Sequence, residues 1–170
     1  MNTALVELFR HNQWANARLL EACSGLSDDV LRANVVGTYG EIWDTLVHFV
    51  RSEEGYLHRL ETGQPRTSAQ GEPDGLDVGQ LRERSLVSGD RLIAVAESFV
   101  SGDRYPVEWE DGKIHNIPAE IYLAQAITHA TEHRSQVCTI LTQQGIEPPD
   151  VSVWAWCDDV IIPELNASAG

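Results

Sequence analysis

The sequence has little positive charge: 12 Lys and Arg residues stand against 26 Asp and Glu, which gives a net charge of −14. The basic residues form no patch, which argues against nucleic acid or an anionic membrane as the main partner. No run of 18 apolar residues occurs, so we expect no transmembrane helix. A G-x-S-x-G nucleophile motif and a phosphate-binding glycine loop are also missing.

Cysteine is scarce as well. The three residues Cys23, Cys138 and Cys157 are odd in number and show no C-x-x-C spacing. This pattern is typical of a reducing compartment, in which the thiols serve as small buried apolar groups. The first seven residues lack the basic segment of a secretory signal peptide. We therefore expect a cytoplasmic protein.

The 170 residues are 42% apolar and 22% charged, which predicts one globular domain over residues 1–170. Apolar residues at helical spacing predict four long helices, over about 3–23, 38–61, 77–100 and 118–145. A T-x-x-E capping box at Thr38–Glu41 is expected to open the second helix, and Asp77 to cap the third. The polar, Gly- and Pro-containing stretch 62–76 is predicted to be a loop.

Two features complete the predicted fold. The segments 105–109 and 113–117 alternate apolar and polar residues around Glu110-Asp111-Gly112, which predicts a β-hairpin. The apolar tail after Asp150 is expected to pack as a short helix across the bundle. The predicted class is all-α: a four-helix up-down bundle with a small hairpin before its last long helix.

Histidine spacing points to a metal site. His129 and His133 lie four residues apart on the fourth predicted helix, so both rings share one face and could bind one metal ion. The alternative is a pair of hydrogen-bonded histidines at the edge of the core. His48 on the second helix is the natural third ligand, although a helical wheel places it opposite the apolar stripe and favours a solvent-facing ring. The remaining histidines, His11, His58 and His115, have weaker claims.

Three stretches resemble the DinB/YfiT-like metalloenzyme family. Residues 10–20 read RHNQWANARLL, close to the family's N-x-W-A-N-x-x-L-L opening. Residues 46–57 read LVHFVRSEEGYL, similar to its L-x-H and E-x-x-W/Y segment. Residues 129–136 read HATEHRSQ, which looks like its H-x3-H-R-x-Q. Together these motifs span nearly the whole chain in the right order.

The resemblance implies a four-helix bundle in which His48, His129 and His133 hold one divalent ion in an open groove. For His48, we give this resemblance more weight than the helical wheel, which favoured a solvent-facing ring. Zn, Ni, Fe and Mn all bind imidazole, so the ligand type does not indicate which metal is bound. Family members include thiol-dependent transferases and isomerases, and homodimers are common. We thus expect a metal-dependent homodimer that activates water or a low-molecular-weight thiol for a small-molecule substrate. The candidates for orienting the ligand rings are Glu53, Glu132 and Gln136.

Two other functions remain open. His129-x-x-Glu132-His133 matches the H-x-x-E-H signature of inverted zinc peptidases, but only 37 residues follow it to supply an acidic ligand. The other alternative is a non-catalytic bundle that binds a metal, a ligand or a partner and dimerises. A closed four-ligand site would favour that alternative, and an open coordination position would favour an enzyme.

Overall fold

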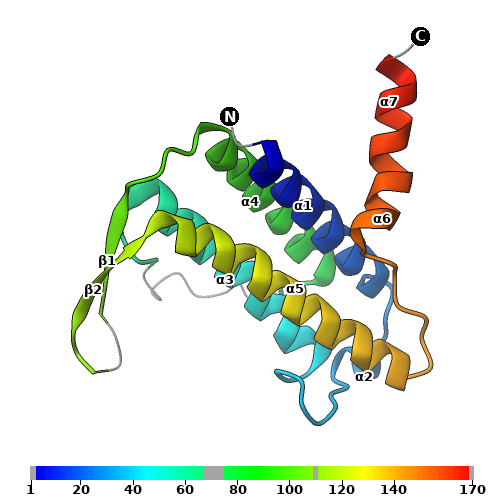
Figure 1. Ribbon diagram of the computed structural model, residues 1–170. Coiled ribbons are helices and arrows are strands. Elements are labelled where there is room, and N and C mark those ends of the chain that lie inside the picture. Colours follow the sequence, from blue (N-terminus) through cyan, green and yellow to red (C-terminus); the bar gives the residue numbers. More distant parts are fainter. Residues whose placement is uncertain (1–2, 67–74, 109–110, 169–170) are drawn as a thin grey trace.

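The computed structural model describes residues 3–66, 75–108 and 111–168. Four long helices lie side by side as a bundle (Figure 1): α1 (Thr3–Cys23), α3 (Ile42–Thr62), α4 (Val78–Ser98) and α5 (Ala119–Gln143). The predicted all-α fold is confirmed, and the four predicted helices are all present. A short helix between the first two long ones, α2 (Asp28–Leu31), was not predicted.

The two predicted helix caps had different outcomes. Asp77 accepts a hydrogen bond from the backbone N–H of Gln80, whose side chain bonds back to the backbone of Asp77, so this end carries a complete capping box. The capping box predicted at Thr38 is wrong. The Thr38 hydroxyl donates to the carbonyl of Val35 instead, and α3 begins four residues later with Glu41 as its N-cap.

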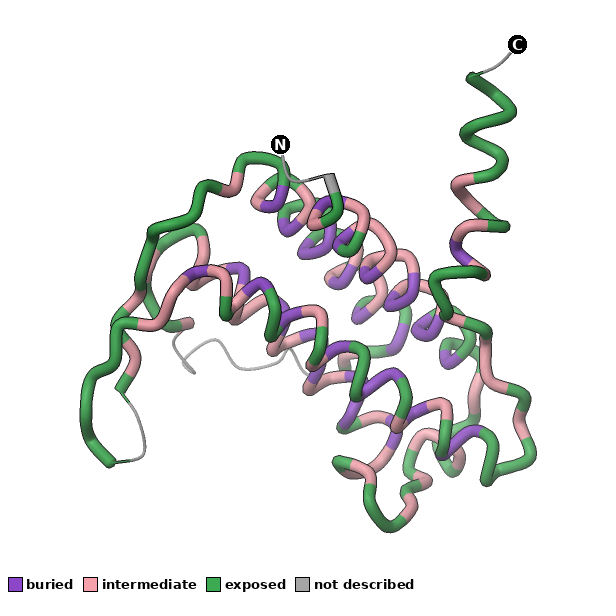
Figure 2. Tube along the Cα trace, in the orientation of Figure 1, coloured by how far each residue is buried: buried purple, intermediate pink, exposed green. Residues whose placement is uncertain are grey.

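Apolar side chains fill the bundle in two clusters. One surrounds Leu19, Leu46 and Ile140, and the other surrounds Phe9 and Leu57. Figure 2 shows that the buried positions face inward along each long helix. Burial of these side chains is the main favourable contribution to folding, and it brings α3 and α5 together.

The predicted hairpin forms, with the first strand beginning one residue earlier and the second strand lying one residue later than predicted. Strands β1 (Arg104–Glu108) and β2 (Ile114–Pro118) are antiparallel and pair Val107 with His115. The Tyr105 hydroxyl donates to the carbonyl of Leu60 at 3.0 Å and so ties β1 to the end of α3. Of the predicted hairpin, residues 109–110 lie outside the described ranges, as do residues 67–74 of the predicted loop.

The C-terminal segment departs from the prediction. It forms α6 (Val153–Trp156), a π-helical turn η1 (Cys157–Ile161) and α7 (Ile162–Ser168). Trp156 is buried and its ring packs against His11 of α1, but α7 has no buried residue. Instead of crossing the bundle, this C-terminal arm (residues 153–168) projects away from it (Figures 1 and 2). Among the described helices, none is long and apolar enough to cross a membrane.

Candidate metal centre

The ring nitrogens of three histidines converge between α3 and α5. The Nε2 atom of His129 lies 3.1 Å from Nε2 of His48 and 3.2 Å from Nε2 of His133. The potential ligand atoms of the three residues all lie within 4.8 Å of one another. In the part of the chain that the structure describes, this is the one such group of His, Cys, Asp or Glu side chains.

The two helices supply the ligands in different ways. On α5, the four-residue spacing stacks His129 and His133 one turn apart on the same face, with ring centroids 4.4 Å apart. His48 comes from α3, and its ring is half-buried rather than solvent-facing. A helical wheel gives the direction of a side chain only relative to the apolar stripe of its own helix. It could not show that α5 covers the face of α3 that carries His48.

Gln136 fixes the tautomer of His133. Its Oε1 atom accepts the backbone N–H of Tyr39 at 3.2 Å and also lies 2.9 Å from Nδ1 of His133. Because an amide oxygen only accepts, Nδ1 of His133 carries the proton. In the neutral ring, the lone pair is therefore on Nε2, which points at the other two histidines. The hydrogen bond from His133 to Gln136 thus holds the orientation of the His133 ring.

Two tyrosine rings border the histidines. Tyr39, in the segment before α3, stacks on His48 with centroids 4.1 Å apart and meets His133 edge-on at 5.2 Å. Tyr56 of α3 meets His129 edge-on at 5.8 Å. These rings exclude water from part of the cluster and restrain the imidazoles. Sequence reasoning missed Tyr39 because its position follows from a non-helical segment whose path has no periodic signal.

Two of the three histidines, His129 and His48, have lowered pKa values. Burial lowers the pKa of His129 to about 4, and the neighbouring His133 and His48 rings add to the shift. Burial also lowers the pKa of His48, again with a contribution from His133. A low pKa keeps a ring neutral near pH 7, which is the form that binds a metal.

The donor set fits a divalent cation. Two nitrogens that each lie about 2.0–2.1 Å from a tetrahedral ion are about 3.3 Å apart, close to the 3.1 and 3.2 Å spacings seen here. Without an ion, the Nε2 atoms can be satisfied only by an N–H from one ring, and that proton can bond to only one neighbouring lone pair at a time. A cation would bind the Nε2 lone pairs of all three rings at once.

Comparison with known proteins identifies the family and the fold. The sequence profile of the DinB family matches residues 1–158. The chain belongs to the DinB family. The crystal structure of a DinB-like protein, YjoA of Bacillus subtilis, is similar in fold, with a TM-score of 0.61 and 14% sequence identity; the match covers 88% of this chain and 98% of that one. No curated protein matches the sequence.

The other two candidate orienting residues of this DinB-family chain lie elsewhere. Glu132 is exposed on α5. Glu53 is buried, but its described hydrogen bonds come from the Asn12 amide at 3.0 Å, the Asn16 amide at 2.9 Å and the Ser88 hydroxyl at 2.5 Å. Burial raises the pKa of Glu53, and these three donors oppose the shift. Three donated hydrogen bonds suit a carboxylate.

Arg134 completes a buried polar network around Glu53. Its Nη1 atom donates to the side-chain oxygens of Asn12 at 2.7 Å and Asn16 at 2.5 Å, and Nη2 donates to Thr131 at 2.9 Å. Burial lowers the pKa of Arg134 to about 10, although nearby Glu53 raises it. The guanidinium therefore stays charged at neutral pH. We call Asn12, Asn16, Glu53, Ser88 and Arg134 the buried network.

A groove of about 760 Å³ reaches the cluster from one side. His48 is part of its wall, so small molecules can approach this ligand from solvent. The rest of the groove is lined by Tyr39, Gly40, Trp43, Asp44, Val47, Arg51 and Ser52.

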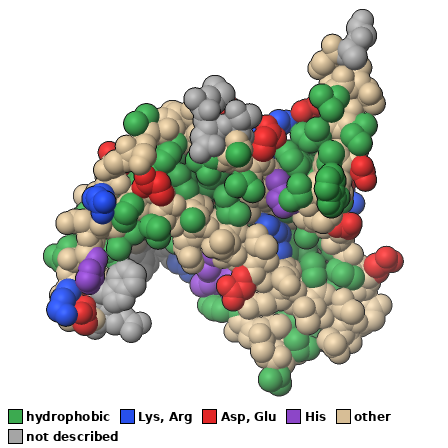
Figure 3. Space-filling model, in the orientation of Figure 1, with side chains coloured by type: hydrophobic (Ala, Val, Ile, Leu, Met, Phe, Trp, Pro, Cys, Tyr) green, Lys and Arg blue, Asp and Glu red, His purple; other side chains and the backbone are tan. Residues whose placement is uncertain are grey.

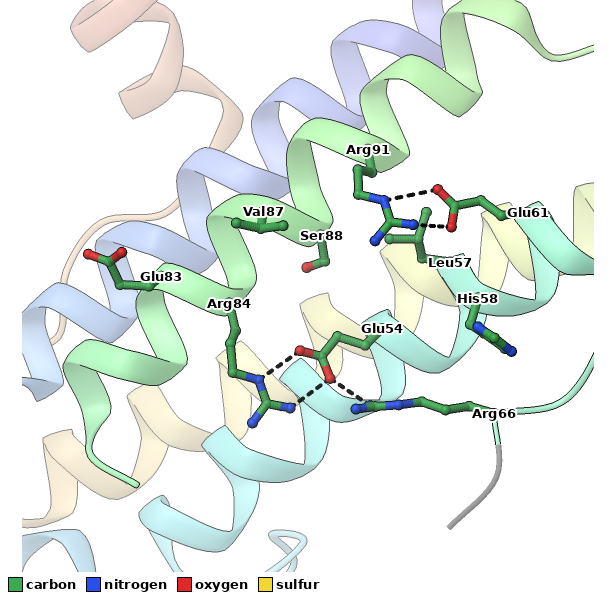
Figure 4. Close-up of a pocket in the computed structure, with 10 residues that line it drawn as sticks. All are labelled: Glu54, Leu57, His58, Glu61, Arg66, Glu83, Arg84, Val87, Ser88 and Arg91. Atoms are coloured by element: carbon green, nitrogen blue, oxygen red, sulfur yellow. Dashed lines mark hydrogen bonds and ion pairs between the residues drawn. The ribbon is translucent and has the colours of Figure 1, made fainter. Parts of the chain in front are cut away.

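A separate cavity of about 360 Å³ lies between α3 and α4 (Figure 4). Five of the charged groups that line it form ion pairs. Glu54 accepts from Arg84 at 2.7 Å and from Arg66 at 2.6 Å, and Arg91 pairs with Glu61. Burial raises the pKa of Glu54 but the two guanidinium groups lower it more, so the net direction is down. None of the three clustered histidines lines this cavity.

The three weaker histidine candidates stay outside the cluster. His11 is half-buried, with its ring against Trp156 of the C-terminal arm and its Nε2 3.0 Å from the carbonyl oxygen of Val151, just before the arm. His58 lines the α3–α4 cavity. His115 is exposed on β2. Each of these three histidines thus has its own local surroundings and does not belong to the cluster of His48, His129 and His133.

Proposed function

We propose that this chain is a metal-dependent enzyme in which His48, His129 and His133 hold one divalent transition metal that activates water or a low-molecular-weight thiol. The supporting observation is the convergence of three Nε2 atoms from two helices. The tautomer set by Gln136 and the low pKa of His129 favour the neutral, metal-binding form.

Three neutral imidazoles would leave the full charge of the ion at the site. A bound ion would lower the pKa of a coordinated water toward about 7 and deprotonate a coordinated thiol. Zn, Ni, Fe and Mn are all compatible with this donor set. The groove beside His48 is the size expected for a small-molecule substrate, and the absence of a basic patch from the sequence argues against nucleic acid.

A test of catalysis needs the metal-loaded protein and a matched control. Thioether formation from a low-molecular-weight thiol and an electrophile, and hydrolysis of activated esters, would be followed with wild type and with His48→Ala. The proposal expects turnover that the variant lacks and that a chelator abolishes. Equal rates in the two proteins would contradict a catalytic role for this site.

The alternative function is a non-catalytic bundle that binds a metal or ligand and dimerises. One observation favours dimerisation under either function: the C-terminal arm exposes large apolar side chains, with Trp154 77% and Leu165 64% exposed. Figure 3 shows such side chains gathered on the projecting segment. A lone chain gains nothing from this exposure, and exposed apolar patches mark interaction sites.

We propose that the occupant of this face is a second copy of the chain. Homodimers are common in the DinB family, and ion pairs of Glu164 with Arg10 and of Asp159 with Arg18 hold the arm to α1 of its own chain, so that its apolar side chains stay presented to a partner. Light scattering should show a dimer for wild type and a monomer for Trp154→Ser/Leu165→Ser. Val100→Ser, equally exposed at 77%, is the control that should stay dimeric. A monomeric wild type would contradict the proposal.

The location of the protein is a further proposal. The described cysteines are all free thiols, and burial raises the pKa of Cys23 to about 12, with a smaller contribution from Cys138. Such a thiol is unreactive at neutral pH. Together with the sequence pattern, this supports a cytoplasmic protein without structural disulfides.

A further inference from the structure

The buried network joins all four long helices at one level of the bundle. Asn12 and Asn16 belong to α1, Glu53 to α3, Ser88 to α4 and Arg134 to α5. All five side chains are at most 3% exposed. The charged groups are connected through the two asparagines, each of which donates to Glu53 and accepts from Arg134.

Such an arrangement is poorly explained by stability alone. Removing two charges from water costs free energy that their attraction repays only with good geometry, and apolar replacements of buried pairs are often neutral or stabilising. What a fully bonded network does provide is geometric restriction, because every member must keep its distance and angle to retain its partners. A restricted geometry matters most near a site that has to be precise.

The network is attached to the same two helices that carry the metal ligands. Arg134 directly follows His133 on α5, and Glu53 lies five residues after His48 on α3. The two asparagines hold Arg134 and Glu53 at a fixed separation, and that separation constrains how α3 and α5 are rotated and shifted against each other. The same rotation and shift decide whether Nε2 of His48 lies near Nε2 of His129.

We propose that the buried network is a positioning device for the metal centre, so that α1 and α4, which supply no ligand, control metal affinity. This inference rests on the proposed metal site. Asn12, Asn16, Ser88, Glu53 and Arg134 are positioning residues in this account: they touch no ligand ring through a described hydrogen bond and act through the placement of the two helices.

Two substitutions perturb the network by different amounts. Ser88→Ala removes one hydrogen bond to Glu53 and should fold. Asn16→Leu breaks the bridge on both sides and leaves Arg134 and Glu53 one partner short. The control is Leu92→Ala, which opens a cavity in the second apolar cluster and destabilises the protein without touching the network.

Zn²⁺ affinity would be measured by competition with a chromophoric chelator, at a temperature where all variants are folded. Direct hydrogen-bond partners of metal ligands typically contribute about 10–100-fold to affinity, and residues that act through the placement of the helices should reach the lower part of this range. We expect a loss in this range for Asn16→Leu, a smaller loss for Ser88→Ala, and none for Leu92→Ala. The visible absorption of bound Co²⁺ should also change in the two network variants and remain that of wild type in the control.

A metal-free readout separates this inference from the proposed function. In the ¹⁵N spectrum of the apo protein, the His129 and His133 ring signals should shift in the network variants and not in Leu92→Ala. Zn²⁺ affinities and Co²⁺ spectra that match wild type in both network variants would overturn the positioning role while leaving the metal site intact. A wild type that binds no metal would overturn both proposals.

Discussion

Gln136 and His133 lie one turn apart on α5 and share a hydrogen bond of 2.9 Å between Oε1 and Nδ1. The same oxygen accepts the backbone N–H of Tyr39. One amide group thereby connects a candidate metal ligand to the aromatic ring that stacks on a second ligand, His48. The support of the site thus reaches beyond the helices that carry the histidines.

Replacing this amide should weaken metal binding. In Gln136→Leu, Nδ1 of His133 loses its acceptor, the proton can move to Nε2, and the segment at Tyr39 loses an anchor. We expect Zn²⁺ affinity to fall by about 10-fold or more, as measured by chelator competition. Gln136→Glu keeps an acceptor at the same place and should retain most of the wild-type affinity. If the two variants bind alike, the hydrogen bond does not orient the ring.

The apo protein should lose stability in mild acid through His129. Its pKa is about 4 when folded and 6.5 in the ordinary state, so between these values the unfolded chain binds more protons. The contribution of His129 is complete above pH 6.5 and is lost as the pH falls to about 4. Urea unfolding of wild type and His129→Gln, with a chelator present, measures this difference. If the unfolding free energies of wild type and His129→Gln change equally between pH 6.5 and about 4, the pKa of His129 is not lowered by folding.

Two helical glycines should respond to alanine in opposite directions. A Cβ on Gly89 would lie 2.5 Å from Cγ of Gln13, whose side chain is held by hydrogen bonds to α4. Gly89→Ala should therefore destabilise the α1–α4 contact by about 1–3 kcal/mol. A Cβ on Gly55 meets nothing within 4 Å, so Gly55→Ala should stabilise α3 by about 0.5–1 kcal/mol. Chemical unfolding checks both, and a neutral Gly89→Ala would contradict the close packing.

The capping box of α4 should contribute measurably to stability. Asp77→Ala removes the side-chain acceptor for the backbone N–H of Gln80 and should cost about 1 kcal/mol in unfolding free energy. Ser27 is the matched control, because it occupies the N-cap of α2 without a side-chain cap bond, and Ser27→Ala should have little effect. Equal losses for the two variants would show that the cap bond is not the cause.

The long helices could be predicted from sequence because their signals are local. Apolar spacing and the Asp77 cap lie within a few residues of the structure that they predict. The Thr38 cap failed for a related reason: Thr38 has a nearer acceptor, the Val35 carbonyl, and a short motif does not reveal which of two local hydrogen bonds forms. The apolar residues of the tail predicted packing, but among its described residues only Trp156 is buried, while Trp154 and Leu165 stay exposed.

The candidate site was less accessible to sequence reasoning because it depends on contacts between helices. The spacing of His129 and His133 is local and could be interpreted directly. His48 became a candidate through family resemblance, since its own helix gives no sign of the neighbouring α5. Asn12 and Asn16 belong to the motif over residues 10–20, but their partners Glu53 and Arg134 are 37 to 122 residues away in sequence, so no local pattern connects them.

Metal content tests the central claim most directly. Untagged wild type and His129→Ala/His133→Ala would be purified without chelators or metal resin, and their transition metals measured by elemental analysis, with circular dichroism to confirm that both are helical. The account predicts about one metal ion per wild-type chain and none in the variant. A wild type that holds no metal, even after incubation with Zn, Ni, Mn or Fe, or a variant that keeps one ion per chain, would contradict it.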